Sequence, residues 1–183
     1  MLEPTSFTLK PFKATLETEE IALTGTILRT DNTLSLRYLL SGNLDKVRIP
    51  QPNPTPQRRD RLWEQTCLEY FLHPTNPSTS HYWEINLSPC GDWNIFALSG
   101  YRTGLQEELA IAHLPFQIHQ TPDRLQLDLT MDIAPLSGTQ DIQIGISAVL
   151  IFGDRESHWA IAHPATQADF HHPKSFALHF PNR

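Results

Sequence analysis

The sequence lacks the features that assign a protein to a class at sight. Only two of its 183 residues are cysteines, Cys67 and Cys90, and no apolar run approaches the ~18 residues needed to span a bilayer. The first ten residues are polar and include Glu3, which is unlike a signal peptide. We therefore expect a cytoplasmic protein without membrane contact, in which the two cysteines remain reduced thiols.

Positive charge is also scarce. Lysine and arginine number 14 against 20 aspartates and glutamates, which gives a net charge of −6, and the only basic cluster is Arg58, Arg59 and Arg61. Nucleic acid is excluded as a partner, because binding a phosphate backbone requires a basic face. No glycine-rich phosphate loop is present either. A small molecule or a glycan is the class of partner that remains.

Helix signals are nearly absent, whereas alternation of apolar and polar residues recurs along the chain, as expected for strands with one buried face. The clearest example is 125–133, where Leu125, Leu127, Leu129, Met131 and Ile133 should face the core. The other predicted strands are Ile21–Arg29, 34–40, Leu62–Leu72, His81–Leu87, Trp93–Leu98, Ile111–His119, 142–152 and 176–180.

The breaks between these segments carry turn residues, as in Ser88–Asp92 and Leu136–Gly138. The alternating prolines of 50–56 predict a long loop, and Thr103–Ala110 has room for one or two helical turns. Many short strands without βαβ alternation indicate an all-β protein with less than ~15% helix, an antiparallel β-sandwich or jelly roll. We expect 1–183 to form a single domain.

The region between Arg61 and Arg102 is unusually rich in carboxylates, amides and aromatic rings. If Leu62–Leu72 is a strand, Glu69 shares a face with Trp63, while Glu84 and Asn86 share a face of the next strand. Buried charges beside bulky rings are costly unless they are paired. These residues therefore form either a structural polar network or the floor of a polar cleft. Aromatic rings that stack and polar groups that hold hydroxyls would suit a sugar.

Two segments of this region carry a resemblance to a known family. They are Leu62-Trp63-Glu64-x-x-Cys67-x-Glu69-x-Phe71 and Tyr82-x-Glu84-x-Asn86-x-Ser88-Pro89-x-Gly91-x-Trp93-Asn94. The sequence resembles the DOMON-like group of small bacterial proteins, which is related to carbohydrate-binding module family nine. The resemblance implies a β-sandwich with a pocket for a sugar or a haem, and two tryptophans that sandwich a terminal sugar in the sugar-binding relatives.

Several residues are candidates for such a site. Trp63, Trp93 and Trp159 are eligible as stacking residues, whereas Trp83 alternates with Ile85 and fits the core better. The candidates for hydrogen bonds to a ligand are Glu69, Glu84, Asn86, Asn94 and Arg102. We hypothesise that Trp63, Glu84, Asn86, Trp93 and Arg102 meet in one pocket.

A second constellation lies near the C-terminus, where His158, His163 and His171 are candidate metal ligands. The alternative is that they are loop histidines at a cleft mouth, since no helix sets their spacing. Haem with histidine ligands is possible although no cofactor is expected, and Met131 fits core packing better than iron.

The favoured function is a non-catalytic, carbohydrate-binding module that combines aromatic stacking with a polar cleft. One alternative is a haem-binding electron-transfer domain. The other is an enzyme that uses the clustered carboxylates or a metal held by histidine. Cys67 alternates with Phe71 and fits a buried hydrophobe better than a nucleophile.

Overall fold

The computed structural model describes residues 3–76 and 78–182, and almost all of their regular structure is β. The strands are β1 (Thr5–Pro11), β2 (Ile21–Thr30), β3 (Thr33–Gly42), β4 (Cys67–Pro74), β5 (Tyr82–Leu87), β6 (Trp93–Leu98), β7 (Gln106–Glu107), β8 (Phe116–Thr121), β9 (Arg124–Asp132), β10 (Ile142–Phe152), β11 (Arg155–Ala160) and β12 (Leu178–Phe180). In the described residues, α1 (Ala134–Ser137) is the one α-helix, beside the 3₁₀ turns η1 (Thr18–Glu20), η2 (Leu44–Lys46), η3 (Leu62–Glu64) and η4 (Pro173–Ser175).

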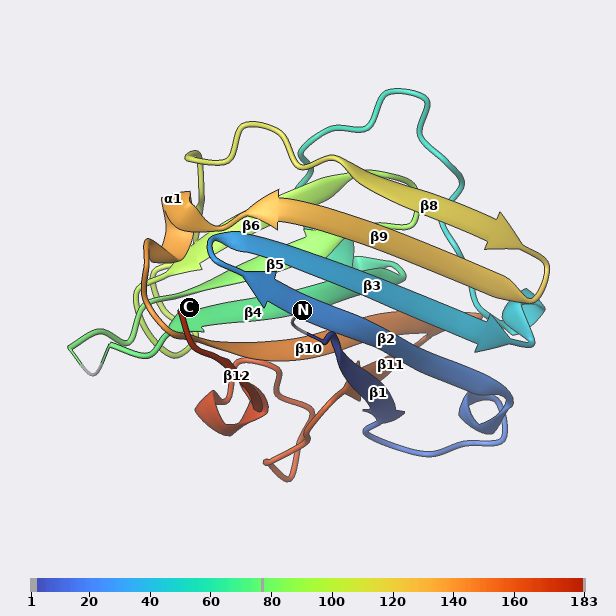
Figure 1. The fold of residues 1–183 in the computed structure, drawn as a ribbon. Coiled ribbons are helices and arrows are strands. Elements are labelled where there is room, and N and C mark those ends of the chain that lie inside the picture. Colours follow the sequence, from blue (N-terminus) through green and yellow to red (C-terminus); the bar gives the residue numbers. More distant parts are fainter. Residues whose placement is uncertain (1–2, 77, 183) are drawn as a thin grey trace.

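The strands form two antiparallel layers, so the predicted all-β antiparallel sandwich is confirmed. Sheet A has the order β1-β2-β3-β9-β8, and sheet B has the order β7-β6-β5-β4-β10-β11, with β12 pairing to β10. Figure 1 shows sheet A lying over sheet B. Strand β1 joins them, because 5–9 pair with β2 whereas Lys10 and Pro11 pair with β11. No helix in residues 3–76 and 78–182 is long and apolar enough to cross a membrane.

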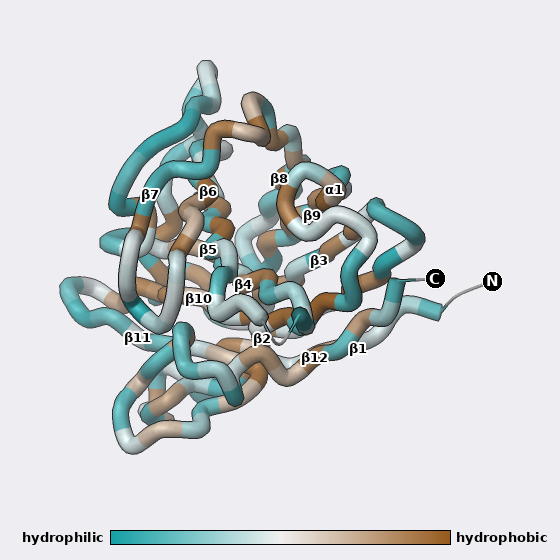
Figure 2. Tube along the Cα trace, turned by 90° about the vertical axis from the view of Figure 1, so that its left-hand side faces the viewer, coloured by the Kyte–Doolittle hydropathy of each residue, from teal (hydrophilic) through white to brown (hydrophobic). Residues whose placement is uncertain are grey.

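The core lies between the two sheets and follows the alternation of the sequence. Leu125, Leu127, Leu129 and Met131 in β9 are all buried, as predicted, while the residues between them are partly or fully exposed. Leu68, Tyr70 and Leu72 supply the facing side of β4. In Figure 2 hydrophobic and hydrophilic segments alternate along the strands, and many of the outer loops are hydrophilic.

Four predicted boundaries are wrong. The chain from Leu62 to Thr66 is not strand, because η3 follows Arg61 in a left-handed conformation (φ 58°), and β4 begins only at Cys67. Thr103–Ala110 contains the short strand β7 instead of a helical turn, and Ile111–His119 is strand only from Phe116. Phe176 lies outside β12, within the turn that ends η4.

The predicted hairpin of 82–87 and 93–98 forms as β5 and β6, with Asn86 opposite Asn94. Strand β4 continues this row, because Glu69 pairs with Asn86. Since residues directly opposite one another project to the same face of a sheet, the three polar side chains share the face of sheet B that points away from sheet A. The next row carries Phe71 and Glu84 on that outer face. The register thus places the polar and aromatic residues of three strands side by side.

Candidate ligand-binding cleft

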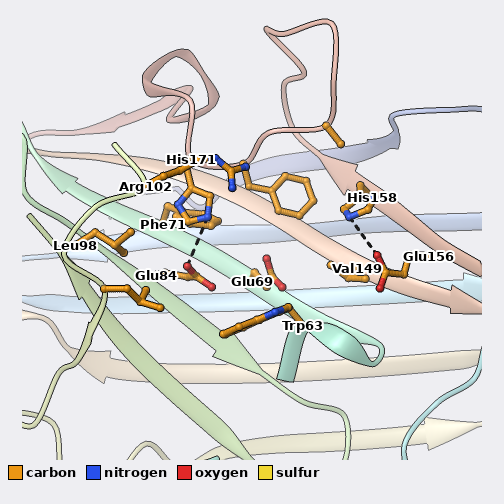
Figure 3. A pocket seen from close by; sticks show the side chains of 13 residues that line it. Trp63, Glu69, Phe71, Glu84, Leu98, Arg102, Val149, Glu156, His158 and His171 are labelled. Atoms are coloured by element: carbon orange, nitrogen blue, oxygen red, sulfur yellow. Dashed lines mark ion pairs between the residues drawn. The ribbon is translucent and has the colours of Figure 1, made fainter. Parts of the chain in front are cut away.

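A cleft of about 390 Å³ opens over the outer face of sheet B. Its floor comes from β4, β5 and β10, its walls from η3 and β11, and its rim from the loops that follow β6 and precede η4. Figure 3 shows these side chains converging on one space. The lining residues are Trp63, Glu69, Phe71, Glu84, Leu98, Arg102, Leu105, Val149, Glu156, His158, Ala168, Phe170 and His171.

Two buried glutamates form the floor. Glu69 is 2% exposed and Glu84 is 6% exposed; the first faces Asn86 across the β4–β5 pair and the second faces Phe71, so they are diagonal neighbours. Figure 3 shows their carboxyl groups on the same floor. Burial raises the pKa of Glu69 well above its ordinary value, and the charge of Glu84 raises it further. Burial likewise raises the pKa of Glu84.

Glu84 has polar partners on both sides. Its Oε1 accepts a hydrogen bond from Asn86 Nδ2 at 2.8 Å, and its Oε2 lies 3.8 Å from Nε2 of His171. Nδ1 of His171 lies 2.9 Å from the hydroxyl of Tyr82, which accepts from the backbone N–H of Arg102. The contact with Tyr82 orients the imidazole so that Nε2 faces Glu84. Burial lowers the pKa of His171 to about 4, which keeps the ring neutral at physiological pH.

Glu69 differs, because its Oε1 is buried and has no hydrogen-bond partner among the described residues. Buried polar atoms are nearly always hydrogen-bonded in folded proteins, and an unpaired carboxyl oxygen costs free energy. The atom belongs to a residue that lines the cleft. A ligand donor placed there would satisfy it.

An ion pair and a hydrogen bond to Asp169 hold the rim of the cleft. Nη2 of Arg102 lies 2.9 Å from Oδ1 of Asp169, whose other oxygen accepts from the hydroxyl of Tyr101 at 2.6 Å. Arg102 has a left-handed backbone (φ 53°), which is uncommon outside glycine and is found where the surroundings fix a conformation. The ion pair ties the loop after β6 to the loop before η4 at the rim of the cleft.

Aromatic rings form the apolar surface. Trp63 is half-buried and packs edge-on against Phe96, with ring centroids 5.7 Å apart. Phe71 lies on the floor, and its centroid is 6.5 Å from that of Phe170. The indole of Trp63 thus offers a flat apolar face beside the carboxyl groups, whereas Phe71 is 1% exposed and stacks on Phe176.

A second hollow of about 420 Å³ adjoins the first and shares Glu156, His158 and Ala168 with it. Its other walls include Phe12 and Phe152. The outer surface is therefore hollowed over a longer path than the cleft alone.

Four predicted site residues meet in the cleft, namely Trp63, Glu69, Glu84 and Arg102. Asn86 does not line the cleft, but its amide donates a hydrogen bond to Glu84 and so positions that carboxyl group. Asn94 is fully buried and bonds to Arg58, Glu107 and the backbone of Arg59. These bonds connect β6 to β7 and to the loop that precedes η3, and Asn94 does not line the cleft.

The two other predicted stacking residues point into the core, which corrects their assignment. Trp93 is 6% exposed and pairs with Leu87, a core residue, so the register turns its indole toward sheet A. Trp159 is 2% exposed and pairs with Ala148, also in the core. Trp83 is a core residue, as predicted.

The predicted metal-ligating histidines do not converge. His158 and His171 line the cleft, whereas Nε2 of His163 bonds to the backbone carbonyl of Lys10. Within residues 3–76 and 78–182, no group of three or more histidine, cysteine or acidic side chains could hold a metal ion. Met131 is buried in the core, where its sulfur contacts the hydroxyl of Tyr70. Cys67 and Cys90 are free, as predicted.

Sequence reasoning missed Phe71, Phe170, Val149, Leu98 and Glu156 as lining residues. Phe71 could have been found, since it alternates with Glu69 on the same strand face. Phe170 could not, because it lies in a loop whose path no periodicity indicates.

The fold has relatives among solved structures. No family model matches the chain, and no curated protein matches it at a significant level. A protein of Bacteroides uniformis described as a "putative carbohydrate-binding protein" matches with a TM-score of 0.62 and 11% identity, over 92% of this chain and 83% of that one. A carbohydrate-binding module of family nine from Caldicellulosiruptor kristjanssonii, in complex with cellotriose, matches with a TM-score of 0.51 and 11% identity, over 86% and 72%. At this identity the likeness establishes a shared β-sandwich fold.

Proposed function

We propose that this chain is a non-catalytic carbohydrate-binding module that holds a glycan in the cleft on the outer face of sheet B. The observation that carries the proposal is the buried carboxyl of Glu69, whose Oε1 has no partner in the described residues although it belongs to the cleft floor. Sugar hydroxyls donate hydrogen bonds and would satisfy it. The half-buried indole of Trp63 supplies an apolar face beside it, which suits the C–H face of a pyranose ring.

Three further observations support the proposal. The structure of the family nine module that shares the fold is that of a complex with cellotriose. The sequence resemblance to DOMON-like proteins, which we propose as the wider group, likewise implies a pocket for a sugar or a haem. The second hollow beside the cleft would extend the contact to a longer chain.

A glycan-array screen followed by isothermal titration tests this function, with cellotriose as the first probe. Glu69→Met keeps the side-chain length but removes the carboxyl group, so affinity should fall about tenfold or more, the effect of losing ~1.4 kcal/mol. Glu19→Met is the matched control, because Glu19 is exposed and outside both hollows. Circular dichroism verifies that each variant is folded. If no glycan binds, the proposal is refuted. A haem absorption band in the purified protein would favour the haem-binding alternative instead.

A further inference from the structure

The cleft has more acidic than basic side chains in its lining. Glu69 and Glu84 lie on its floor and Glu156 on its wall. Arg102 is the one lysine or arginine among its described lining residues, and its guanidinium is already paired with Asp169. A ligand that touches the floor therefore meets carboxyl groups and no lysine or arginine of the described lining.

Among the described residues, the surroundings of Glu69 contain no unpaired lysine or arginine side chain. On β5, Asn86 donates its amide to Glu84. On β10, Ser147 is the residue opposite Glu69. Its hydroxyl is buried and has no hydrogen-bond partner among the described residues. Tyr38 reaches from sheet A, but its hydroxyl bonds to the backbone carbonyl of Glu69 on the core side.

The remaining titratable groups near this floor belong to other elements. They are Cys67 on β4, Tyr82 on β5, His158 and Glu156 on β11, and Arg102, Asp169 and His171 on the rim loops. His158 contacts Glu156 at 3.8 Å, and His171 faces Glu84. None of them donates a hydrogen bond to the Oε1 of Glu69.

We infer that the cleft selects a sugar unit bearing a protonated amino group, a hexosamine, over its neutral counterpart. The inference rests on the proposed function and deepens it. An ammonium group donates up to three hydrogen bonds and accepts none, which fits a floor of two carboxyl groups and an unpartnered hydroxyl. It also balances their charge, and charge-assisted hydrogen bonds of this kind are the strong ones. The neighbouring half-buried ring of Trp63 tolerates a cation near its face.

Binding of such a ligand is coupled to proton release. Burial raises the pKa of both floor glutamates, so the empty cleft retains a proton on this pair at pH values where an exposed glutamate is ionised. An ammonium group beside them lowers that pKa and favours the carboxylate. The proton then passes from the pair to the buffer, while the ligand keeps its own. A neutral sugar releases none.

Isothermal titration with three matched trimers tests the inference: cellotriose, its 2-amino counterpart (β-1,4-linked glucosamine) and the N-acetylated form of that counterpart. At about pH 6, where the amines are protonated, the amino trimer should bind about 10- to 100-fold more tightly than cellotriose. Titration in two buffers of different ionisation enthalpy should reveal proton release for the amino trimer alone.

Variants of the two floor glutamates test whether these residues cause the preference for the amino trimer. Glu69→Gln should bring the affinity ratio of amino trimer to cellotriose toward one and reduce proton release, because Glu84 is then the one floor glutamate with a raised pKa. Glu84→Gln serves as a second floor variant if the first is not folded, and Glu19→Gln is the control that should preserve the ratio. If cellotriose binds as tightly as the amino trimer, or the N-acetylated trimer binds best, the inference is overturned and the proposed function stands. If no trimer and no array glycan binds, both fall.

Discussion

Replacing Trp93 by alanine tests which face of sheet B its indole occupies. The side chain is 6% exposed and packs in the main core. A buried tryptophan removes about 150–250 Å² from water, which at ~25 cal/mol per Å² is an upper value of ~4–6 kcal/mol. Measured losses for such truncations centre on ~3–5 kcal/mol. The guanidinium of Arg58, 4.4 Å from the ring centroid, adds a cation–π contact that the variant also loses.

We therefore expect Trp93→Ala to lower the free energy of unfolding by ~3–5 kcal/mol in urea denaturation, with an unchanged m-value. The melting temperature should fall by about 6–20 °C, at ~2–4 °C per kcal/mol for a chain of this size. The matched variant is Trp63→Ala, whose half-buried indole lines the cleft. It should weaken glycan binding strongly and cost much less stability. A Trp93→Ala protein with wild-type stability and lost binding would show that the indole lies on the outer face of sheet B instead.

Two further outcomes are expected. Leu129→Ala in β9 should cost ~2–5 kcal/mol, because the side chain is 2% exposed in the core, and an unchanged urea midpoint would contradict that placement. Because the pKa of Glu69 is higher in the folded protein than its ordinary value of 4.5, the protonated side chain contributes to folding stability. This contribution is complete below pH 4.5 and is lost as the pH rises through the folded-state pKa. Wild-type stability should thus fall more steeply than that of Glu69→Gln as pH rises above about 4.5, as followed by urea titrations. His171, whose lowered pKa acts in the opposite direction between 6.5 and about 4, is present in both proteins and cancels in the difference.

Much of the sandwich could be predicted because alternation is a direct record of one-sided burial. Strand β9 is the clearest case, since every second residue is apolar and the others are polar. The β5–β6 hairpin followed from two apolar runs around a turn. The paired glutamates of the floor followed as well, because charge beside aromatic residues on a strand is unusual enough to demand an explanation.

The errors have physical reasons. Strand β6 is apolar on both faces, with Trp93 and Ile95 on one and Phe96 and Leu98 on the other, so periodicity alone could not orient its indole. Trp159 lies among histidines in a segment that resembles a loop, yet pairing with β10 makes it a core strand. The loop carrying Phe170 reaches the cleft through long-range packing, which leaves no local trace.

Strand β1 has a consequence for the order in which the molecule folds. Its first half needs only the nearby β2, but Lys10 must find Ala160 near the other end of the chain. Closing so long a loop is entropically costly, and such distant pairings slow folding. During synthesis the β1–β3 meander is available long before β11 exists, so the junction between the sheets is closed among the last contacts. A nascent chain arrested before residue 155 would leave the edge of β10 that later receives β11 unpaired, exposed to other strands.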